Sequence, residues 1–348
     1  MAGRWAEGFE THQNATQLAR KYATQSGTST ANTGRVFGSS GQVASLVLVT
    51  QSLGLADTWV HGFGVRIASQ QTAMNSGAQG FYFEKSATEQ CHIEFVNNSG
   101  SFEVRLMRGA TQVAITTSAF AYAVWHYFEW KVTIATGTGG VYEVRHNGVN
   151  VLSGSSVNLA NAGSNQADIW AVRFSSNLGT NFLFDDNYVV DTTGAANNDF
   201  LSPVVVEGIL PNAAGTTTQW TNDAGSGSNF NNVQDAGSST PDDSGAGGTN
   251  SSDTVGQKDT YAFADLTQIL GTIHFVQLGT QMAMASAGSR SVKTRFRDNG
   301  GTEADIATKS VASTAYDEFV DVMDVNPQST AAWDVTDIQG GEFGVEVV

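Results

Sequence analysis

Apolar and polar side chains alternate with a period of two along much of the chain, which is typical of β-strands that bury one face. In the run 102–108, Phe102, Val104 and Leu106 alternate with Glu103 and Arg105. The run 125–134 predicts the strongest strand, because its aromatic residues are concentrated in six positions. The strands expected in the first half are Gln42–Gln51, Trp59–Ile67, Gly80–Lys85, Ile93–Asn97, Phe102–Arg108, Trp125–Ile134, Tyr142–His146, Val149–Leu152, Asp168–Phe174 and Phe182–Val190.

Asn147-Gly148 is the clearest hairpin signal, because this dipeptide supplies the positive φ values of a type I′ turn between two strand-like runs. No helical pattern separates the strands of this half, and parallel pairing would require crossover helices. We therefore expect antiparallel sheets stacked as a jelly-roll sandwich. Helix is predicted only for residues 11–22, with Thr11 or Asn14 as the N-cap and Arg20 and Lys21 in the last turn, and for a short stretch at 331–338.

A domain boundary is expected near Asp191–Asn198, which contains turn-forming residues and no apolar side chain larger than Ala. It divides the chain into an N-terminal domain, 1–195, and a C-terminal domain, 200–348. The polar tract 222–252 predicts a long surface loop within the second domain. The remaining runs predict a smaller antiparallel β-sandwich with strands at Pro203–Pro211, Asp259–Phe263, Thr272–Ala285, Ser291–Asp298, Phe319–Val325 and Glu342–Val348.

Charge and cysteine content narrow the classes of function. The net charge of −16 argues against a nucleic-acid partner, because phosphate binding requires a basic surface. The single cysteine, Cys91, excludes an internal disulfide and is expected to be a small buried apolar residue. No run of ~18 apolar residues predicts membrane insertion, and the N-terminus lacks the apolar segment of a signal peptide, so we expect synthesis in a cytoplasm.

Catalytic motifs are not apparent, and we expect no enzymatic activity. The six histidines are scattered singly without zinc-ligand spacing, although two of them could still meet in space: His12, His61, His92, His126, His146 and His274. No serine lies in a nucleophile elbow between a strand and a helix. A glycosidase would need two carboxylates in one cleft, and the runs after Glu94 and Glu143 lack the Glu-x-Asp-x-x-Glu pattern of sandwich hydrolases. Hydrolysis remains an alternative.

Two binding roles remain open. Asp185 and Asp186 could donate oxygens to calcium, or their carboxylates could accept hydrogen bonds from neighbouring backbone N–H groups at a strand end. Trp125, Tyr127 and Trp170 are the candidates for stacking on glycan rings. Strand alternation places Trp125 and Tyr127 on one face and Phe128 and Trp130 on the other, and at least one face must be core. No cofactor is expected.

Several structural landmarks are similar to those of a known family. The opening Glu7-Gly-Phe-Glu10, the strand 125–134 with its W-x-Y-x-E-x-K-V pattern, the hairpin Val144–Gly148 and the strand Phe184–Val189 resemble bacteriophage virion proteins with a concanavalin A-like (LamG-type) jelly roll. In the second half, Pro203-Val-Val-Val with Gly208-Ile-Leu-Pro, Asp259–Phe263, the turn at Trp333 and Gly341–Val345 also resemble phage proteins.

The resemblance implies a non-enzymatic structural protein of a phage particle, located in the virion at the tail, a fibre or a spike. It implies contact with other virion proteins, assembly as a homo-oligomer with a trimer favoured, and contact with host surface glycans. A head decoration or head-fibre protein is one alternative. A free carbohydrate-binding protein or glycosidase is another.

Overall fold

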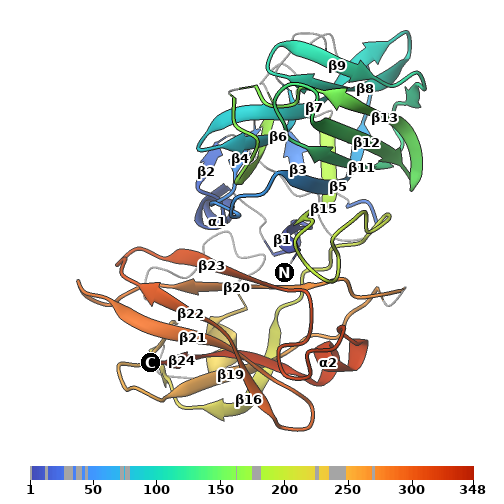
Figure 1. Cartoon of the computed structure of the whole chain (residues 1–348). Helices are drawn as coiled ribbons and strands as arrows, with labels where there is room; N and C mark the ends of the chain where they lie inside the picture. Colours follow the sequence, from blue (N-terminus) through green and yellow to red (C-terminus); the bar gives the residue numbers. More distant parts are fainter. Residues whose placement is uncertain are drawn as a thin grey trace. The chain divides into compact units, whose positions relative to one another are not determined.

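The computed structural model describes residues 2–11, 15–26, 34–36, 41–43, 46–70, 74, 79–161, 163–174, 182–223, 227–234, 248–268 and 271–348. The chain divides into two compact units, one of residues 1–9 and 13–206 and the other of residues 10–12 and 207–348 (Figure 1). The main division therefore lies just after the predicted boundary.

The first unit consists of two antiparallel sheets (Figure 1). The first sheet contains, in spatial order, β1 (Gly3–Glu7), β15 (Phe182–Asp191), β5 (Thr58–Ile67), β11 (His126–Thr133), β12 (Gly140–His146) and β13 (Val149–Val157), with β3 (Gly41–Val43) also paired to β15. The second contains β10 (Phe120–Ala121), β8 (Ser101–Arg108), β7 (Thr88–Asn98), β6 (Gly80–Lys85), β14 (Ile169–Phe174), β4 (Leu46–Val49) and β2 (Thr24–Ser26), with β9 (Thr111–Ile115) on β8. This arrangement confirms the jelly-roll sandwich predicted from the alternation.

Aromatic side chains fill the space between the two sheets. Trp59 of the first sheet stacks on Phe83 of the second, with ring centroids 5.4 Å apart. His61 is fully buried there, and its Nδ1 accepts a hydrogen bond of 2.8 Å from Nε1 of Trp130. Burial lowers the pKa of His61 to about 3, so the ring is neutral in the folded protein. Cys91 is also buried, as predicted.

β15 is unusual because all ten of its residues are buried. Its outward side therefore cannot face solvent, as an alternating strand would allow. The register with β5 is broken between Asp185 and Tyr188, and Asp186 has a left-handed backbone conformation with φ 51°. Because of this break, the carboxylates of Asp185 and Asp186 form hydrogen bonds with other parts of the first unit.

The second unit contains a five-stranded sheet and a two-stranded sheet (Figure 1). The larger sheet has the order β16 (Pro211–Thr218), β19 (Lys258–Phe263), β24 (Glu342–Val347), β21 (Arg290–Arg297) and β22 (Glu303–Val311), and the smaller one pairs β20 (Val276–Met282) with β23 (Asp317–Met323). β17 (Thr221–Asn222) and β18 (Asn250–Ser251) bracket the described part of the predicted loop, with a 3-10 turn at Asn229–Asn232. The core contains Phe296, Met323, Trp333, Ile338 and Phe343.

Two helices are present where helix was predicted, both shorter than or shifted from the expected ranges. α1 spans Ala15–Lys21 and ends at the predicted Arg20 and Lys21, whereas the candidate cap Asn14 lies outside the described residues. α2 spans Val335–Gly340, and Asp334 caps it by accepting a hydrogen bond from the Thr336 N–H. Among the described residues, neither helix is long and apolar enough to span a bilayer.

The prediction of a strand at Pro203–Pro211 is wrong, because the strand in this region begins only at Pro211. The run Val204–Val206 lies in irregular structure, and the Val206 N–H donates to a carboxylate of β15 instead of to a sheet. Sequence reasoning also missed β22, whose residues Glu303–Val311 are mostly polar and form a sheet edge. An edge strand needs little apolar sequence, since only part of it is buried.

Because His61 stays neutral when folded, we expect stability to fall as the pH is lowered from about 6.5, the usual histidine pKa, towards about 3. The unfolded chain binds a proton in this window that the folded chain excludes, which costs up to about 1.4 kcal/mol per pH unit. His61→Gln should be less stable at pH 7, since it disturbs the contact with Trp130, but should show a shallower pH dependence between pH 6.5 and 5. Urea denaturation at several pH values checks this, and equal slopes for the two proteins would contradict it.

Candidate functional site

The outer face of the first sheet, which points away from the sandwich core, carries a cluster of buried polar side chains. We call it the polar face. Residues 199–206, the anchored segment, lie against one part of it, and the part over β11, β12 and β13 remains open. The anchored segment belongs to the first unit and leads directly into the second along the chain.

Glu129 of β11 and Tyr188 of β15 hold the start of the anchored segment. Tyr188 donates its hydroxyl proton to Oε1 of Glu129 over 2.5 Å, and the hydroxyl oxygen accepts the Leu201 N–H at 3.2 Å. The same Glu129 oxygen accepts the Ser202 N–H at 2.9 Å. Gly62 of β5 makes this arrangement feasible, because a Cβ at this position would lie 2.0 Å from the Tyr188 ring.

Arg35 and Asp186 hold the end of the segment. The Asp186 carboxylate accepts Nε of Arg35 at 2.6 Å through Oδ2 and the Val206 N–H at 2.8 Å through Oδ1. Arg35 also donates from Nη2 to the Val204 carbonyl. Its side chain lies across Gly64, where a Cβ would come within 2.7 Å of the Arg35 Cδ. Because Gly62 and Gly64 have no side chains, Tyr188 and Arg35 can lie across them.

Two looser contacts complete the attachment at the border with the open part. Lys131 forms an ion pair of 3.0 Å with Asp199, and both side chains are partly exposed. The guanidinium of Arg145 lies over the Phe200 ring, 3.9 Å from its centroid. Exposed ion pairs contribute little, so the buried contacts of Glu129 and Asp186 supply most of the fastening.

Burial raises the pKa of Glu129, and the hydrogen bonds from Tyr188 and Ser202 only partly oppose it. The second carboxylate oxygen, Oε2, is buried without a hydrogen-bond partner. Burial also raises the pKa values of Asp185 and Asp186, with Arg35 acting in the opposite direction on both. These carboxyl groups have the raised pKa values of catalytic acids, but their hydrogen bonds join parts of the chain to one another.

The calcium ligands predicted at Asp185 and Asp186 already have partners within the chain. Asp185 accepts the Asp186 N–H at 2.8 Å and the Arg35 N–H at 2.6 Å, one on each oxygen. The guanidinium of Arg35 supplies a positive charge to Asp186. Elsewhere in the described part of the chain, His, Cys, Asp and Glu side chains form no group of three or more that could hold a metal ion. The carboxylates of both aspartates thus accept backbone N–H groups, which is the alternative to calcium binding that the sequence left open.

Two of the three predicted glycan-stacking residues are inaccessible, which corrects that prediction. Tyr127 is on the polar face, but it is buried beneath Arg35, whose guanidinium carbon lies 4.8 Å from the ring centroid. Trp170 is fully buried in the core, where its ring stacks on that of Phe81 with the centroids 6.2 Å apart. Trp125 is half-buried and retains accessible surface. The alternation of side chains along the strand assigned Tyr127 and Trp130 to the correct faces. It could not reveal that Arg35 covers Tyr127 and that both side chains are buried.

The open part of the polar face contains a shallow groove of ≈ 390 Å³. Its lining is polar, with hydroxyl groups and one side chain of each charge, and comes from Lys131, Thr133, Val141, Tyr142, Glu143, Ser153, Gly154 and Ser155. Such a surface can form hydrogen bonds with a polyhydroxylated ligand. The aromatic rings of Tyr127 and Trp170 are buried and do not contribute to it. No sequence motif singles out these hydroxyls, because they belong to ordinary residues of strands.

Two histidines do meet in space, although the sequence separates them by twenty residues. Nδ1 of His126 lies 2.9 Å from Nε2 of His146, and Nε2 of His126 is 2.8 Å from the Ala121 carbonyl oxygen. The latter contact places the His126 proton on Nε2, so His146 donates to Nδ1 of His126. Burial lowers the pKa values of both, that of His146 to about 4, and the pair is neutral near pH 7.

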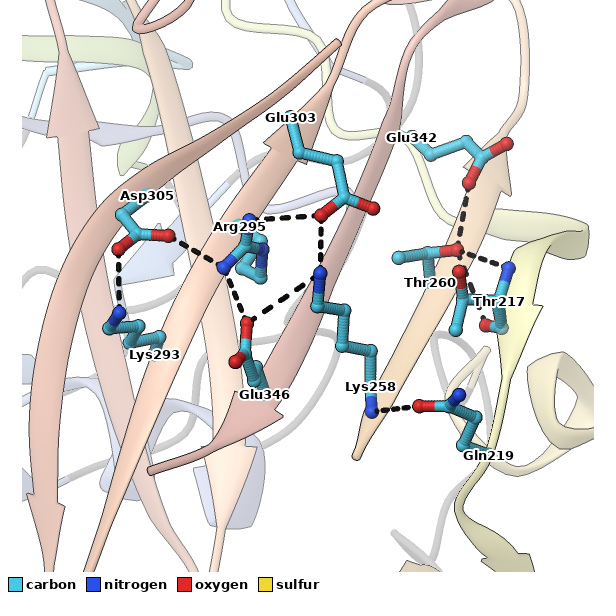
Figure 2. Close-up of polar contacts among 10 residues, drawn as sticks. All are labelled: Thr217, Gln219, Lys258, Thr260, Lys293, Arg295, Glu303, Asp305, Glu342 and Glu346. Carbon is cyan, nitrogen blue, oxygen red and sulfur yellow. Dashed lines mark hydrogen bonds and ion pairs between the residues drawn. The ribbon is translucent and has the colours of Figure 1, made fainter. Parts of the chain in front are cut away.

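The outward side of the five-stranded sheet of the second unit carries a network of ion pairs (Figure 2). Arg295 of β21 is its centre and contacts Glu303 at 2.9 Å, Asp305 at 2.7 Å and also Glu346. The Arg295 side chain is only 13% exposed. A guanidinium with several donors suits such multiple carboxylate contacts.

Lysines extend the network on both sides of Arg295. Lys258 pairs with Glu303 at 2.5 Å, and Lys293 pairs with Asp305 at 2.8 Å (Figure 2). The hydrogen bond from Lys258 lowers the pKa of Glu303, and that from Lys293 lowers the pKa of Asp305. These basic side chains are neutralised within the sheet, so they do not form a basic patch for a polyanion.

Glu129→Gln should keep both hydrogen bonds to Oε1 and remove a buried charge, whereas Glu129→Ala should lose both bonds and about 2–3 kcal/mol of stability. The folded pKa of Glu129 is raised, so its destabilising charge develops as the pH rises above about 4.5, the usual glutamate pKa. The stability of Glu129→Gln relative to the original protein should therefore increase from pH 4.5 upwards. Urea denaturation and hydrogen exchange at Ser202 measure both effects, and equal losses in the two variants would contradict this role.

Arg295→Met should destabilise the second unit by about 2–4 kcal/mol, because three carboxylates lose a largely buried cation. Lys293→Met is the matched control on the same strand. Its partner Asp305 is 46% exposed, so the expected loss is below about 1 kcal/mol. Thermal and urea denaturation of the whole chain would compare them, and similar losses would show that Arg295 is not the centre of the network.

No family model and no curated protein matches the chain. Several solved structures are similar in fold. Domain 4 of AbnA, an extracellular GH43 arabinanase from Geobacillus stearothermophilus solved with arabinotriose, is 14% identical, with a TM-score of 0.40, over 55% of this chain and 92% of that one. Alginate lyase Aly36B is 10% identical, with a TM-score of 0.35, over 54% and 97%. The carbohydrate recognition domain of Emp46p is 6% identical, with a TM-score of 0.35, over 54% and 97%. Nothing about the activity of this chain follows from matches of this strength.

Proposed function

We propose that this protein is a non-enzymatic structural component of a bacteriophage particle, located at the tail or in a fibre or spike. The observation that best supports this is the fastening of the anchored segment to the first sandwich. The buried polar groups of the polar face hold the chain that leads into the second unit, with Glu129 and Asp186 accepting backbone N–H groups from Ser202 and Val206. A connection fixed in this way resists pulling on the chain, as a particle component requires.

The carboxyl groups of the polar face are better placed to hold the chain than to catalyse a reaction. A general acid must reach a substrate within hydrogen-bonding distance. Glu129 and Asp185 are 1% exposed, and their hydrogen bonds are made to other parts of the same unit. In this role they position the backbone, and their raised pKa values reflect burial rather than acid–base work.

Contact with host surface glycans is the second part of the proposal, and the open groove supports it. Lys131, Glu143 and the hydroxyls of Thr133, Ser153 and Ser155 present donors and acceptors of the kind that sugars use. Partner contacts would then include other virion proteins and copies of the same chain.

Mass spectrometry of purified phage particles should detect peptides from both units of this chain in a fixed ratio to the known structural proteins. Antibody labelling in electron microscopy should place it at the tail, whereas labelling of the capsid would indicate the head decoration alternative. Absence of the chain from particles would overturn the proposal.

The glycan part is tested separately on the purified chain. We expect binding on a glycan array that Lys131→Ala and Ser153→Ala weaken, without release of reducing or unsaturated sugars from the bound glycans. Sugar release would replace the non-enzymatic role with a carbohydrate-active one. Binding that both variants retain in full would exclude the groove as the glycan site.

A further inference from the structure

Two rows of side chains cross the open groove, each with one residue from β11, β12 and β13. In the first row, Val141 of β12 lies opposite Thr133 of β11 on one side and opposite Ser155 of β13 on the other. Val141 is 48% exposed, and Ser155 is also exposed. An apolar side chain between two hydroxyl groups suits a sugar ring, because the C–H groups of the ring gain an apolar contact and its hydroxyls gain hydrogen bonds.

The second row contains the two charged side chains of the groove. Lys131 of β11 lies directly opposite Glu143 of β12, which is in turn opposite Ser153 of β13. Opposite charges at facing positions of a sheet can pair with each other. Here, however, Lys131 pairs with Asp199 at 3.0 Å, and Glu143 pairs with Arg145 at 2.7 Å. Each charge of the groove is therefore balanced by a neighbour.

Asp199 belongs to the anchored segment, and the backbone fixes its carboxylate. One oxygen, Oδ1, accepts hydrogen bonds from the Lys131 ammonium and from the Phe200 N–H, the latter at 2.9 Å. Burial alone would raise the pKa of Asp199, but the hydrogen bonds from Phe200 and Lys131 outweigh it and lower the pKa. The carboxylate is therefore charged at neutral pH and acts as the counter-ion of Lys131.

We propose that Asp199 makes the groove selective for neutral glycans over acidic ones. The inference rests on the glycan contact proposed above and adds the class of sugar. A carboxylate or sulfate on a ligand binds best to a cation, and among the described residues that line the groove only Lys131 is cationic. An acidic ligand must compete with Asp199 for it, whereas a neutral sugar can use the remaining ammonium protons of Lys131.

Charges beside the groove act in the same direction. The nearby Arg145 is not a free cation, because it donates to Glu143 and its guanidinium lies over the Phe200 ring. The net charge of the chain is −16, and its field disfavours the approach of an anionic ligand. A neutral glycan is not subject to this repulsion.

A glycan array of matched pairs tests the selectivity, with each neutral glycan placed beside counterparts that carry a uronic acid, a sialic acid or a sulfate. The original protein should bind the neutral members more strongly. Asp199→Asn keeps an acceptor for the Phe200 N–H and removes the counter-ion of Lys131. It should bind the acidic members about fivefold more tightly, the upper range for a partly exposed ion pair, and leave binding of the neutral members unchanged.

Two further variants show whether Lys131 causes the change. The double variant Asp199→Asn with Lys131→Gln should lose the gain for acidic glycans, because the released cation is absent. Glu103→Gln is the matched control, since it also removes one negative charge but lies on β8 of the second sheet and keeps an acceptor for Asn98. It should leave the preference unchanged.

The outcomes separate this inference from the proposed function. If the original protein binds acidic members as tightly as neutral ones, or if Asp199→Asn gains no more than Glu103→Gln, the selectivity is overturned and the glycan contact stands. If no member of any pair binds, the glycan contact is overturned, and the selectivity with it.

Discussion

The complete burial of β15 is the constraint on which the first unit depends. A strand that is buried on both faces usually has a nearly continuous apolar sequence, but β15 contains Asp185, Asp186, Asn187 and Asp191. Each carboxylate in such a place needs hydrogen bonds or a cation. Asp191 obtains them from Arg4 and Thr193, and Asp186 from Arg35 and Val206. Long-range contacts of the N-terminal and 199–206 segments are therefore a requirement of this strand.

This constraint determines what the polar face can do. The carboxyl groups with raised pKa values satisfy β15 and hold the anchored segment, which leaves the groove beside Lys131 as the open part of this face. The same contacts explain why residues 203–210 form no strand. Once Asp186 accepts the Val206 N–H and Arg35 donates to the Val204 carbonyl, these backbone groups cannot take part in a ladder.

The sequence predicts most of the strands and the sandwich, because alternation and turn signals are local. Tyr142–His146, Asn147-Gly148 and the strand after it agree with β12 and β13. The site is different, since its central pairs are distant in the chain: Arg35 and Asp186 are separated by 151 positions, and Glu129 and Ser202 by 73. A local pattern carries no information about such partners. Gly62 and Gly64 were visible in the sequence, but their function becomes clear only when Tyr188 and Arg35 are seen to cross them.

Charge links the internal architecture to association. The chain has 33 acidic and 17 basic residues, and basic side chains in both units are used in internal pairs, including buried Lys21 with Glu7 and largely buried Arg295 with Glu346. Acidic side chains therefore outnumber basic ones by 16, which is the difference between 33 and 17. At physiological ionic strength, the resulting repulsion is screened beyond about 8 Å, so close contact between copies is governed by what lies directly at the interface.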